Sequence, residues 1–195
     1  MKIVAATHNK GKIKEIQKIL ASLGVEVITQ TEMGITIEPE ENGSTFADNA
    51  LIKARAVKEL CDCAVIADDS GLCVDALGGA PGVYSARYAG EGASDSEKIK
   101  KLLSELSGIS DRTAKFKSAI AFILPDGEEI VTHGEVVGKI TDKPYGEGGF
   151  GYDPVFFSDE LGKTFGEASS EEKNQISHRS RGLKALFEIL SERNL

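Results

Sequence analysis

The chain has 195 residues, with 23 Lys and Arg against 31 Asp and Glu, which gives a formal net charge of −8. A chain of this length can close around one core, so we expect a single domain over residues 1–195. The acidic balance argues against a groove for DNA or RNA, which needs a basic surface, but it allows a local basic pocket for a small anion.

The apolar runs argue against a membrane or secreted protein, and the cysteines argue against a structural zinc site. The longest apolar run is Ala119–Leu124, far short of the ~20 residues of a membrane helix. Lysines follow one short apolar stretch at the N-terminus, so we expect no signal peptide. The three cysteines lack the paired C-x-x-C spacing of a structural zinc site, so we expect free thiols and a cytoplasmic location.

The first part of the chain predicts strands that alternate with helices. Residues 2–7 predict a strand, and apolar residues at helical spacing predict a helix over 13–23, followed by a second strand at 25–29. Thr45 begins a capping-box pattern that opens another helix. Residues 63–67 predict a buried strand that ends where the next polar residues begin.

The second part mixes the two kinds of element without strict alternation. Ser94 begins a capping-box pattern, and residues 113–124 and 128–137 predict a hairpin around a Pro-Asp-Gly turn. A short strand at 154–157 and a closing helix around 183–190 complete the pattern. We therefore expect an α/β fold with a mixed sheet.

Glycines gather in two stretches, which span residues 71–92 and 134–151. Such clustering suggests loops in which the backbone approaches a ligand closely.

Thr7-His8-Asn9-Lys10-Gly11-Lys12 forms a strand-to-helix turn with two lysines. The positive end of a helix and its free N–H groups bind phosphate well, and lysines at this end suggest that an anion offsets them. The turn is not a Walker A loop, because Ile13 stands where Ser or Thr should follow the lysine. The alternative interpretation is a solvated basic start to the helix.

Asp68-Asp69-Ser70-Gly71 follows the predicted buried strand. Two adjacent carboxylates at a strand end suit Mg²⁺, although a turn or helix cap would also explain them. The acidic segment Glu38-Pro39-Glu40-Glu41 could add a further carboxylate, or it could be a solvated loop. Lys53 on the following helix could add positive charge, although a single helical lysine is usually a surface residue.

The C-terminal part contains two further motifs that could bind a ligand. In Gly148-Gly149-Phe150-Gly151-Tyr152-Asp153-Pro154 the glycines leave room for a planar ring to stack on an aromatic side chain, but a core aromatic pair beside a turn is equally plausible. Lys173 and Ser177-His178-Arg179 supply donors for a carbonyl oxygen of a base, or they form a salt bridge at a helix end.

These motifs occur together and in a fixed order. They are Thr-His-Asn-Lys-Gly-Lys at 7–12, Ala-Asp-Asp-Ser-Gly at 67–71, Gly-Ala-Pro-Gly-Val-Tyr-Ser-Ala-Arg-Tyr at 79–88, Gly-Gly-Phe-Gly-Tyr-Asp-Pro at 148–154 and Glu-Lys-Asn-Gln-Ile-Ser-His-Arg at 172–179. In this combination the chain resembles the inosine triphosphate pyrophosphatase family over essentially its whole length.

The resemblance implies a Mg²⁺-dependent enzyme that hydrolyses noncanonical purine nucleoside triphosphates (ITP, dITP and XTP) to the monophosphate and pyrophosphate. It also implies an α/β fold with a long central mixed sheet, flanking helices, two lobes around a substrate cleft, and a homodimer.

The resemblance also assigns roles to residues of this chain. The catalytic carboxylate would be Asp69, the metal ligands Asp69 and Glu40, and the substrate contacts Thr7, His8, Asn9, Lys10, Gly11, Lys12, Lys53, Ser70, Phe150, Gly151, Tyr152, Asp153, Lys173, His178 and Arg179. Because Glu41 is adjacent, a shift of one residue would exchange it with Glu40.

Two rival functions stay open at this point. One is a module that binds a purine nucleotide without hydrolysing it, which would not need adjacent carboxylates. The other is a pyrophosphatase for a different modified nucleotide, such as a methylated pyrimidine triphosphate.

Overall fold

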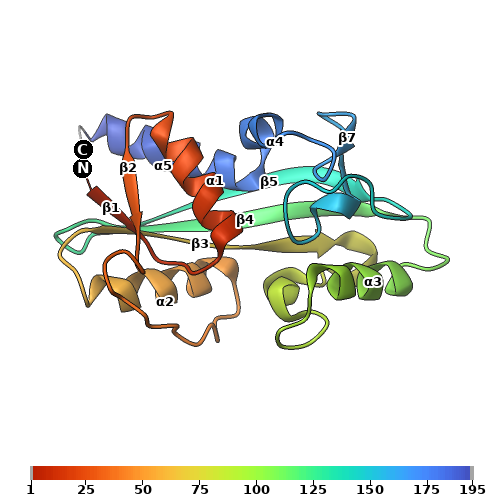
Figure 1. Ribbon diagram of the computed structural model, residues 1–195, viewed down its shortest axis with the longest axis horizontal. Helices are drawn as coiled ribbons and strands as arrows, with labels where there is room; N and C mark the ends of the chain where they lie inside the picture. Colours follow the sequence, from red (N-terminus) through yellow and green to blue (C-terminus); the bar gives the residue numbers. More distant parts are fainter. Residues whose placement is uncertain (1, 194–195) are drawn as a thin grey trace. The chain divides into compact units, whose positions relative to one another are not determined.

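The computed structural model describes residues 2–193 as a seven-stranded sheet with helices against it (Figure 1). The sheet order is β2-β1-β3-β4-β5-β6-β7. The strands are β1 (Lys2–Ala5), β2 (Glu26–Thr29), β3 (Ala64–Val74), β4 (Thr113–Ile123), β5 (Glu129–Ile140), β6 (Phe156–Ser158) and β7 (Lys163–Thr164). The helices are α1 (Lys10–Ala21), α2 (Phe46–Lys58), α3 (Asp95–Glu105), α4 (Ser170–Ile176) and α5 (His178–Glu192), with short 3₁₀ turns at Asp75–Leu77, Gly82–Arg87 and Asp153–Val155.

The sheet is mixed, which confirms the predicted α/β class. Strand β1 pairs in parallel with β2 and with β3, whereas β6 pairs antiparallel with β5 and β7. Parallel neighbours need crossover connections, and α1 and α2 provide them.

The chain divides into two compact units. Unit 1 contains Met1–Asp69, Ser118–Gly134 and His178–Leu195, and unit 2 contains Ser70–Lys117 and Glu135–Ser177. The long strands β3, β4 and β5 each contribute residues to both units. The single domain over residues 1–195 stays a prediction.

Unit 1 has a hydrophobic core on each face of its sheet. Figure 1 shows α1 and α5 on one face and α2 on the other. Ile66 of β3 packs in the core with α1 and α5, and Ala67, the next residue, packs in the core with α2. Side chains alternate between faces along a strand, so Asp68 falls on the face of α1 and α5 and Asp69 on the face of α2.

Unit 2 is organised around an aromatic cluster. The ring of Phe116 lies 4.6 Å from that of Phe156 and 6.0 Å from that of Phe165, measured between ring centroids. Buried Leu72 of β3 and Leu102 of α3 belong to the same core. This core supports the 3₁₀ turn over Asp153–Val155 and the loop before it.

The helix starts follow from local sequence. The predicted capping boxes that begin at Thr45 and Ser94 are present, as is one that begins at Ser169. Helix α1 begins at Lys10, earlier than predicted, because the side chain of Asn9 accepts a hydrogen bond from the N–H of Lys12 and caps the helix. Within residues 2–193, no helix has both the length and the apolar character needed to span a bilayer.

The prediction that the third strand ends at residue 67 was wrong. Strand β3 continues through Asp68 and Asp69 to Val74. The apolar pattern resumes at buried Leu72, and the intervening carboxylates have cationic partners, so charge does not end the strand. The second glycine stretch also starts inside a strand, since Gly134 belongs to β5.

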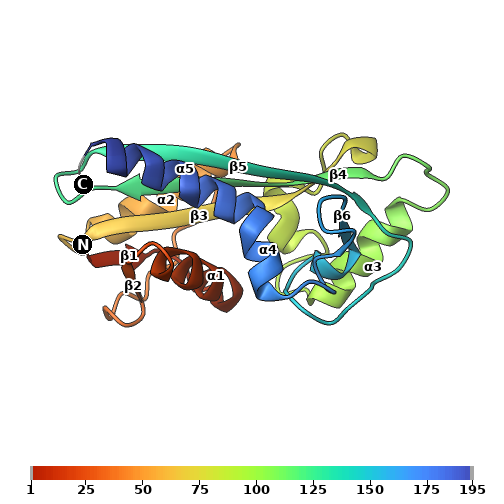
Figure 2. The ribbon, with the colours of Figure 1, turned by 90° about the horizontal axis from the view of Figure 1, so that it is seen from above.

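Helix α5 lies directly on β5 (Figure 2). The hydroxyl of Thr132 donates a 2.8 Å hydrogen bond to the carbonyl of Gly182. A Cβ atom at Gly134 would lie 1.8 Å from the carbonyl oxygen of His178. The absence of a side chain at Gly134 therefore allows the helix to approach this closely.

We expect Gly134→Ala to lower the free energy of unfolding by about 3 kcal/mol or more, because the added methyl group would force α5 away from the strand. Urea denaturation measures the loss. The control is Gly24→Ala, at a residue with φ of +76° and open space around it, which should cost only about 1–2 kcal/mol. Equal losses in the two variants would contradict the close contact.

Candidate functional site

The turn before α1 leaves N–H groups available at the helix N-terminus. Thr7 Oγ1 accepts from the N–H of Asn9 at 3.1 Å, and Asn9 Oδ1 accepts from the N–H of Lys12 at 3.0 Å. Within residues 2–193, the N–H groups of Lys10 and Gly11 donate to no acceptor. Free N–H groups beside two lysines form a local anion-binding geometry.

Asp68 is fully buried and ion-paired on the face of α1 and α5. Its Oδ2 lies 2.8 Å from Lys12 Nζ and 3.1 Å from Arg179 Nη2. Burial alone would raise the pKa of Asp68, but Arg179 and Lys12 outweigh it and hold the pKa well below its usual range. The carboxylate of Asp68 in β3 thus links α1, through Lys12, with α5, through Arg179. Arg179 also pairs with Glu15 of α1.

Asp69 lies in a different environment on the face of α2. Its Oδ1 accepts from Lys53 Nζ at 3.2 Å, and the same ammonium group donates to Glu41 Oε2 at 3.0 Å. Burial raises the pKa of Asp69 despite the opposing effect of Lys53. For Lys53 burial lowers the pKa, but the carboxylates of Asp69 and Glu41 outweigh it and the pKa is raised.

The backbone carbonyl of Asp68 brings the two lysines together. Lys12 Nζ donates to this oxygen at 3.2 Å and Lys53 Nζ at 3.0 Å. The first lysine comes from α1 and the second from α2, so each approaches from a different face of the sheet. Burial lowers the pKa of Lys12, and the charge of Lys53 adds to this effect. We call Lys12, Lys53, Asp68 and Asp69 the charge cluster.

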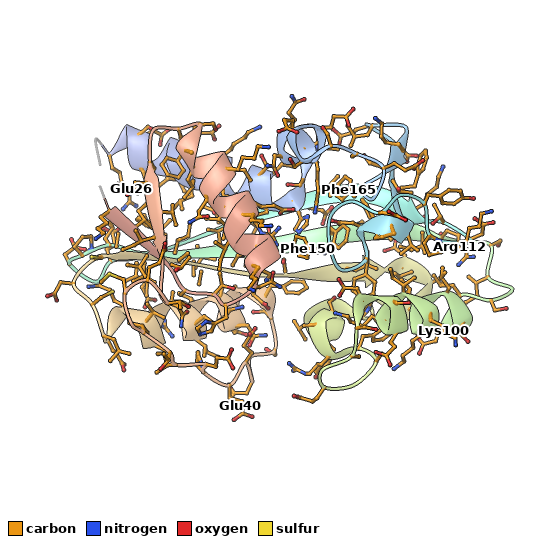
Figure 3. All side chains as sticks on the ribbon, in the orientation of Figure 1. Glu26, Glu40, Lys100, Arg112, Phe150 and Phe165 are labelled. Atoms are coloured by element: carbon orange, nitrogen blue, oxygen red, sulfur yellow. The ribbon has the colours of Figure 1, made fainter. Side chains whose placement is uncertain are left out.

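The acidic segment brings Glu41 to this cluster. Glu41 contacts Lys53, whereas the side chain of Glu40 is exposed and points away from the ribbon in Figure 3. The assignment of Glu40 as a metal ligand stays a prediction, and the contacts favour Glu41.

The donor set of the cluster suits a magnesium ion bound together with a phosphate. Among residues 2–193, no group of three or more His, Cys, Asp and Glu is arranged to hold a metal ion. Asp69 Oδ2 is buried and has no hydrogen-bond partner, and Glu41 shares Lys53 with this carboxylate. Mg²⁺ is commonly held by one or two carboxylates plus substrate phosphates and water, so the residues fit this ion.

Unit 2 contains the second group of predicted residues. Lys173 Nζ donates to Asp153 Oδ2 at 2.6 Å and lies 4.7 Å from the centre of the Phe150 ring. Asp153 Oδ2 also accepts from the N–H of Phe150 at 2.9 Å, and Asp95 accepts from the N–H of Gly151 at 2.7 Å. Two carboxylates and one lysine thus fix the conformation of this loop.

The remaining predicted residues are distributed as follows. Ser70 continues β3 directly after Asp69, and the hydroxyl of buried Tyr152 donates to the carbonyl of Ser85 at 2.8 Å. His178 and Arg179 are buried at the start of α5 and belong to unit 1, whereas Phe150 belongs to unit 2.

Sequence reasoning missed some residues because their partners are distant in the chain. Glu15 contacts Arg179, Gln30 contacts His8, and Asp95 accepts from the N–H of Gly151. Asn49 accepts from the N–H of Gly43, just after the acidic segment. Glu15 is buried with apolar residues of α1, which its charge does not suggest.

Comparisons with known proteins identify the family of the chain. The model of the Ham1 family matches residues 3–189. The chain belongs to the Ham1 family. The dITP/XTP pyrophosphatase of Bacillus subtilis is 51% identical over 189 residues, covering 96% of each chain. The dITP/XTP pyrophosphatase of Escherichia coli O157:H7 is 46% identical over 193 residues, covering 97% of this chain and 98% of the other.

Solved structures of Ham1 proteins have the same fold. The Staphylococcus aureus Ham1 protein is 45% identical, with a TM-score of 0.88 over 99% of this chain and all of the other. The HAM1 protein from Coxiella burnetii is 42% identical, with a TM-score of 0.88 over 98% and 99% of the two chains. Family membership confirms the resemblance inferred from the motifs.

In this Ham1-family chain we expect Asp68→Asn to lower the free energy of unfolding by about 3–5 kcal/mol, because it removes the buried counter-charge of Lys12 and leaves Glu15 as the carboxylate paired with Arg179. Asp69→Asn should cost much less, since burial already disfavours that charge. Denaturation in urea at pH 7 compares the two variants, and equal losses would contradict the assignment of Asp68 as the structural anion.

The free energy of unfolding of these two variants can also be measured as a function of pH. The pKa of Asp68 is lowered on folding, so the stabilisation that its charge provides is fully present above the unfolded pKa of about 3.9 and is lost as the pH falls below it. Asp68→Asn should therefore flatten the acid branch of the stability curve.

Proposed function

We propose that this chain is a Mg²⁺-dependent hydrolase that converts ITP, dITP and XTP to the nucleoside monophosphate and pyrophosphate. The observation that carries the proposal is the charge cluster, in which two lysines meet at the carbonyl of Asp68 next to the carboxylate of Asp69. The names of the B. subtilis and E. coli relatives support the substrate class. Removal of these nucleotides would keep them out of DNA and RNA.

The triphosphate binds at the N-terminus of α1 in this proposal. The free N–H groups of Lys10 and Gly11 face an anion, and Lys12 and Lys53 neutralise further phosphate charge. These fixed donors also stabilise the charge that develops on the pyrophosphate leaving group. The carbonyl of Asp68 accepts from both lysines, so they are already held close together.

Asp69 and Glu41 would hold the magnesium ion. Bound there, the ion would neutralise phosphate charge and act as a Lewis acid. The resemblance names Glu40 as the ligand, and we favour Glu41 because it is the residue that contacts Lys53.

Asp69 orients or deprotonates the water that attacks the α-phosphorus. Its Oδ1 is fixed by Lys53, while Oδ2 has no partner and is available as an acceptor. Burial raises the pKa of Asp69, which strengthens it as a base relative to its neighbour Asp68. Ser70 follows in the strand and contacts substrate in this proposal.

The loop in unit 2 supports recognition of the base. Phe150 offers a ring for stacking, with Gly151, Tyr152 and Asp153 shaping its loop. The resemblance assigns contacts with a 6-keto oxygen to His178 and Arg179 of unit 1, and Arg179 would make this contact from a guanidinium that also pairs with Asp68 and Glu15.

The location and the assembly state are also proposals. The sequence supports a cytoplasmic location, and the resemblance supports a homodimer that binds nucleotides but neither nucleic-acid polymers nor membranes. A nucleotide-binding module without turnover is the competing interpretation, and it would retain the cationic turn without a reactive carboxylate.

We expect purified protein with Mg²⁺ to release pyrophosphate from ITP, dITP and XTP roughly 100-fold faster, as kcat/KM, than from ATP, GTP or dTTP. The assay measures pyrophosphate and orthophosphate separately. Release of orthophosphate would indicate a phosphatase. Tight nucleotide binding without turnover would favour the binding module, and preference for dTTP would favour a pyrimidine substrate.

Replacement of the proposed base gives a sharper test. We expect Asp69→Asn to lower kcat for ITP by at least about 100-fold while the Kd for the nucleotide changes little, because the lysines remain in place. Calorimetric titration measures the Kd. The control is Asp62→Asn on the chain before β3, which should leave both quantities unchanged. Full activity of Asp69→Asn would exclude the assigned role.

A further inference from the structure

The acidic segment that carries Glu41 has no regular secondary structure. Residues 35–43 belong to neither a helix nor a strand, so beyond the backbone hydrogen bond from the N–H of Ile35 to the carbonyl of Gln30 their position depends on contacts made by side chains. Such a segment would place a carboxylate reproducibly only if it were fixed on both sides of that residue.

The first attachment is the side-chain amide of Gln30, which is 3% exposed at the end of β2. Its Nε2 donates to the carbonyl of Ile37 at 3.0 Å and lies 3.3 Å from the carbonyl of Ile35. The same nitrogen lies 2.9 Å from His8 Nε2 in the turn before α1. Gln30 therefore joins the acidic segment to that turn.

His8 lies in the same cluster of contacts. Its Nε2 is 2.9 Å from Gln30 Nε2 and 3.3 Å from the carbonyl oxygen of Ile37, and its Nδ1 is 3.3 Å from Thr31 Oγ1. The carbonyl oxygens of Ile35 and Ile37 both face Gln30 Nε2, which fixes the orientation of the amide, because its oxygen in that place would face lone pairs.

The second attachment is Asn49 of α2, which is 1% exposed. Its Oδ1 accepts from the N–H of Gly43 at 2.8 Å. A Cβ atom at Gly43 would lie 2.5 Å from the Cβ of Asp48 and 2.7 Å from Asn49 Oδ1, so the backbone passes as close to α2 as glycine allows. Lys53, one turn further along the same helix, contacts Glu41 itself.

We propose that Gln30 and Asn49 are positioning residues that hold the acidic segment from both sides and so place the Glu41 carboxylate against Lys53 and Asp69. The inference rests on the proposed function, in which Glu41 and Asp69 act on the bound triphosphate. Neither residue touches substrate in this scheme; each acts through the backbone of the segment.

The first experiment measures the segment itself, without activity. Hydrogen–deuterium exchange in residues 36–44 should speed up in Gln30→Met and in Asn49→Leu, while the rest of unit 1 exchanges as in the wild type. Asn49→Asp keeps the oxygen that accepts from Gly43 and should restore slow exchange. The control is Gln17→Met, which removes a comparable amide contact to the carbonyl of Val27 in β2. Unchanged exchange in both variants would overturn the proposal, whether or not the protein hydrolyses ITP.

The second experiment asks whether the two residues act through Glu41. We expect Gln30→Met to lower kcat for ITP by about 10- to 100-fold with little change in KM, and to raise the Mg²⁺ concentration needed for half-maximal rate. The double variant Gln30→Met/Glu41→Gln should be no slower than Glu41→Gln alone. Additive losses would mean that Gln30 acts independently of Glu41, and this would also overturn the proposal. Inactivity of the wild type would instead reject the proposed function.

Discussion

Two adjacent carboxylates, Asp68 and Asp69, lie in the middle of β3, and each needs a cationic partner. The packing of helices around the sheet of unit 1 has to meet this need. A buried carboxylate is tolerated only with a cationic partner, and alternation along the strand sends Asp68 and Asp69 to opposite faces. Each face must therefore supply its own cations. Helices α1 and α5 supply Lys12 and Arg179 to Asp68, and α2 supplies Lys53 to Asp69. The order of elements around the strand follows from this requirement as much as from the apolar cores.

The two carboxylates differ because their partners differ. Asp68 is enclosed by two cations, and these hold its pKa well below its usual range and favour its charged form. Asp69 shares Lys53 with Glu41, and burial raises its pKa. In the proposed function, stability and reactivity thus fall to neighbouring residues of one strand, Asp68 and Asp69. The carbonyl of Asp68 connects the two environments because it accepts from both lysines.

The features that the sequence predicted well are local ones. The capping boxes at Thr45 and Ser94 depend on residues three positions apart, and the turn between β4 and β5 depends on one Pro-Asp-Gly segment. The length of β3 was not predictable, because its carboxylates look like a strand end until Lys12 and Arg179, far away in the chain, neutralise them. Spacing could not decide between Glu40 and Glu41 either, because the contact of Glu41 with Lys53 is visible only in the structure.

The loop in unit 2 limits how a base could be read. The N–H of Phe150 already donates to Asp153, and the N–H of Gly151 donates to Asp95. The N–H of Phe150 is available to a ligand only if the buried carboxylate of Asp153 loses this donor, which costs about 1–3 kcal/mol, whereas the acceptor of the Gly151 N–H, Asp95, is exposed. If this loop binds the base as proposed, recognition there falls mainly to the face of the Phe150 ring and to side chains, with Lys173 already 4.7 Å from that ring. Stacking accepts any planar base, so in the proposed function discrimination among purines would come from side-chain donors and from shape.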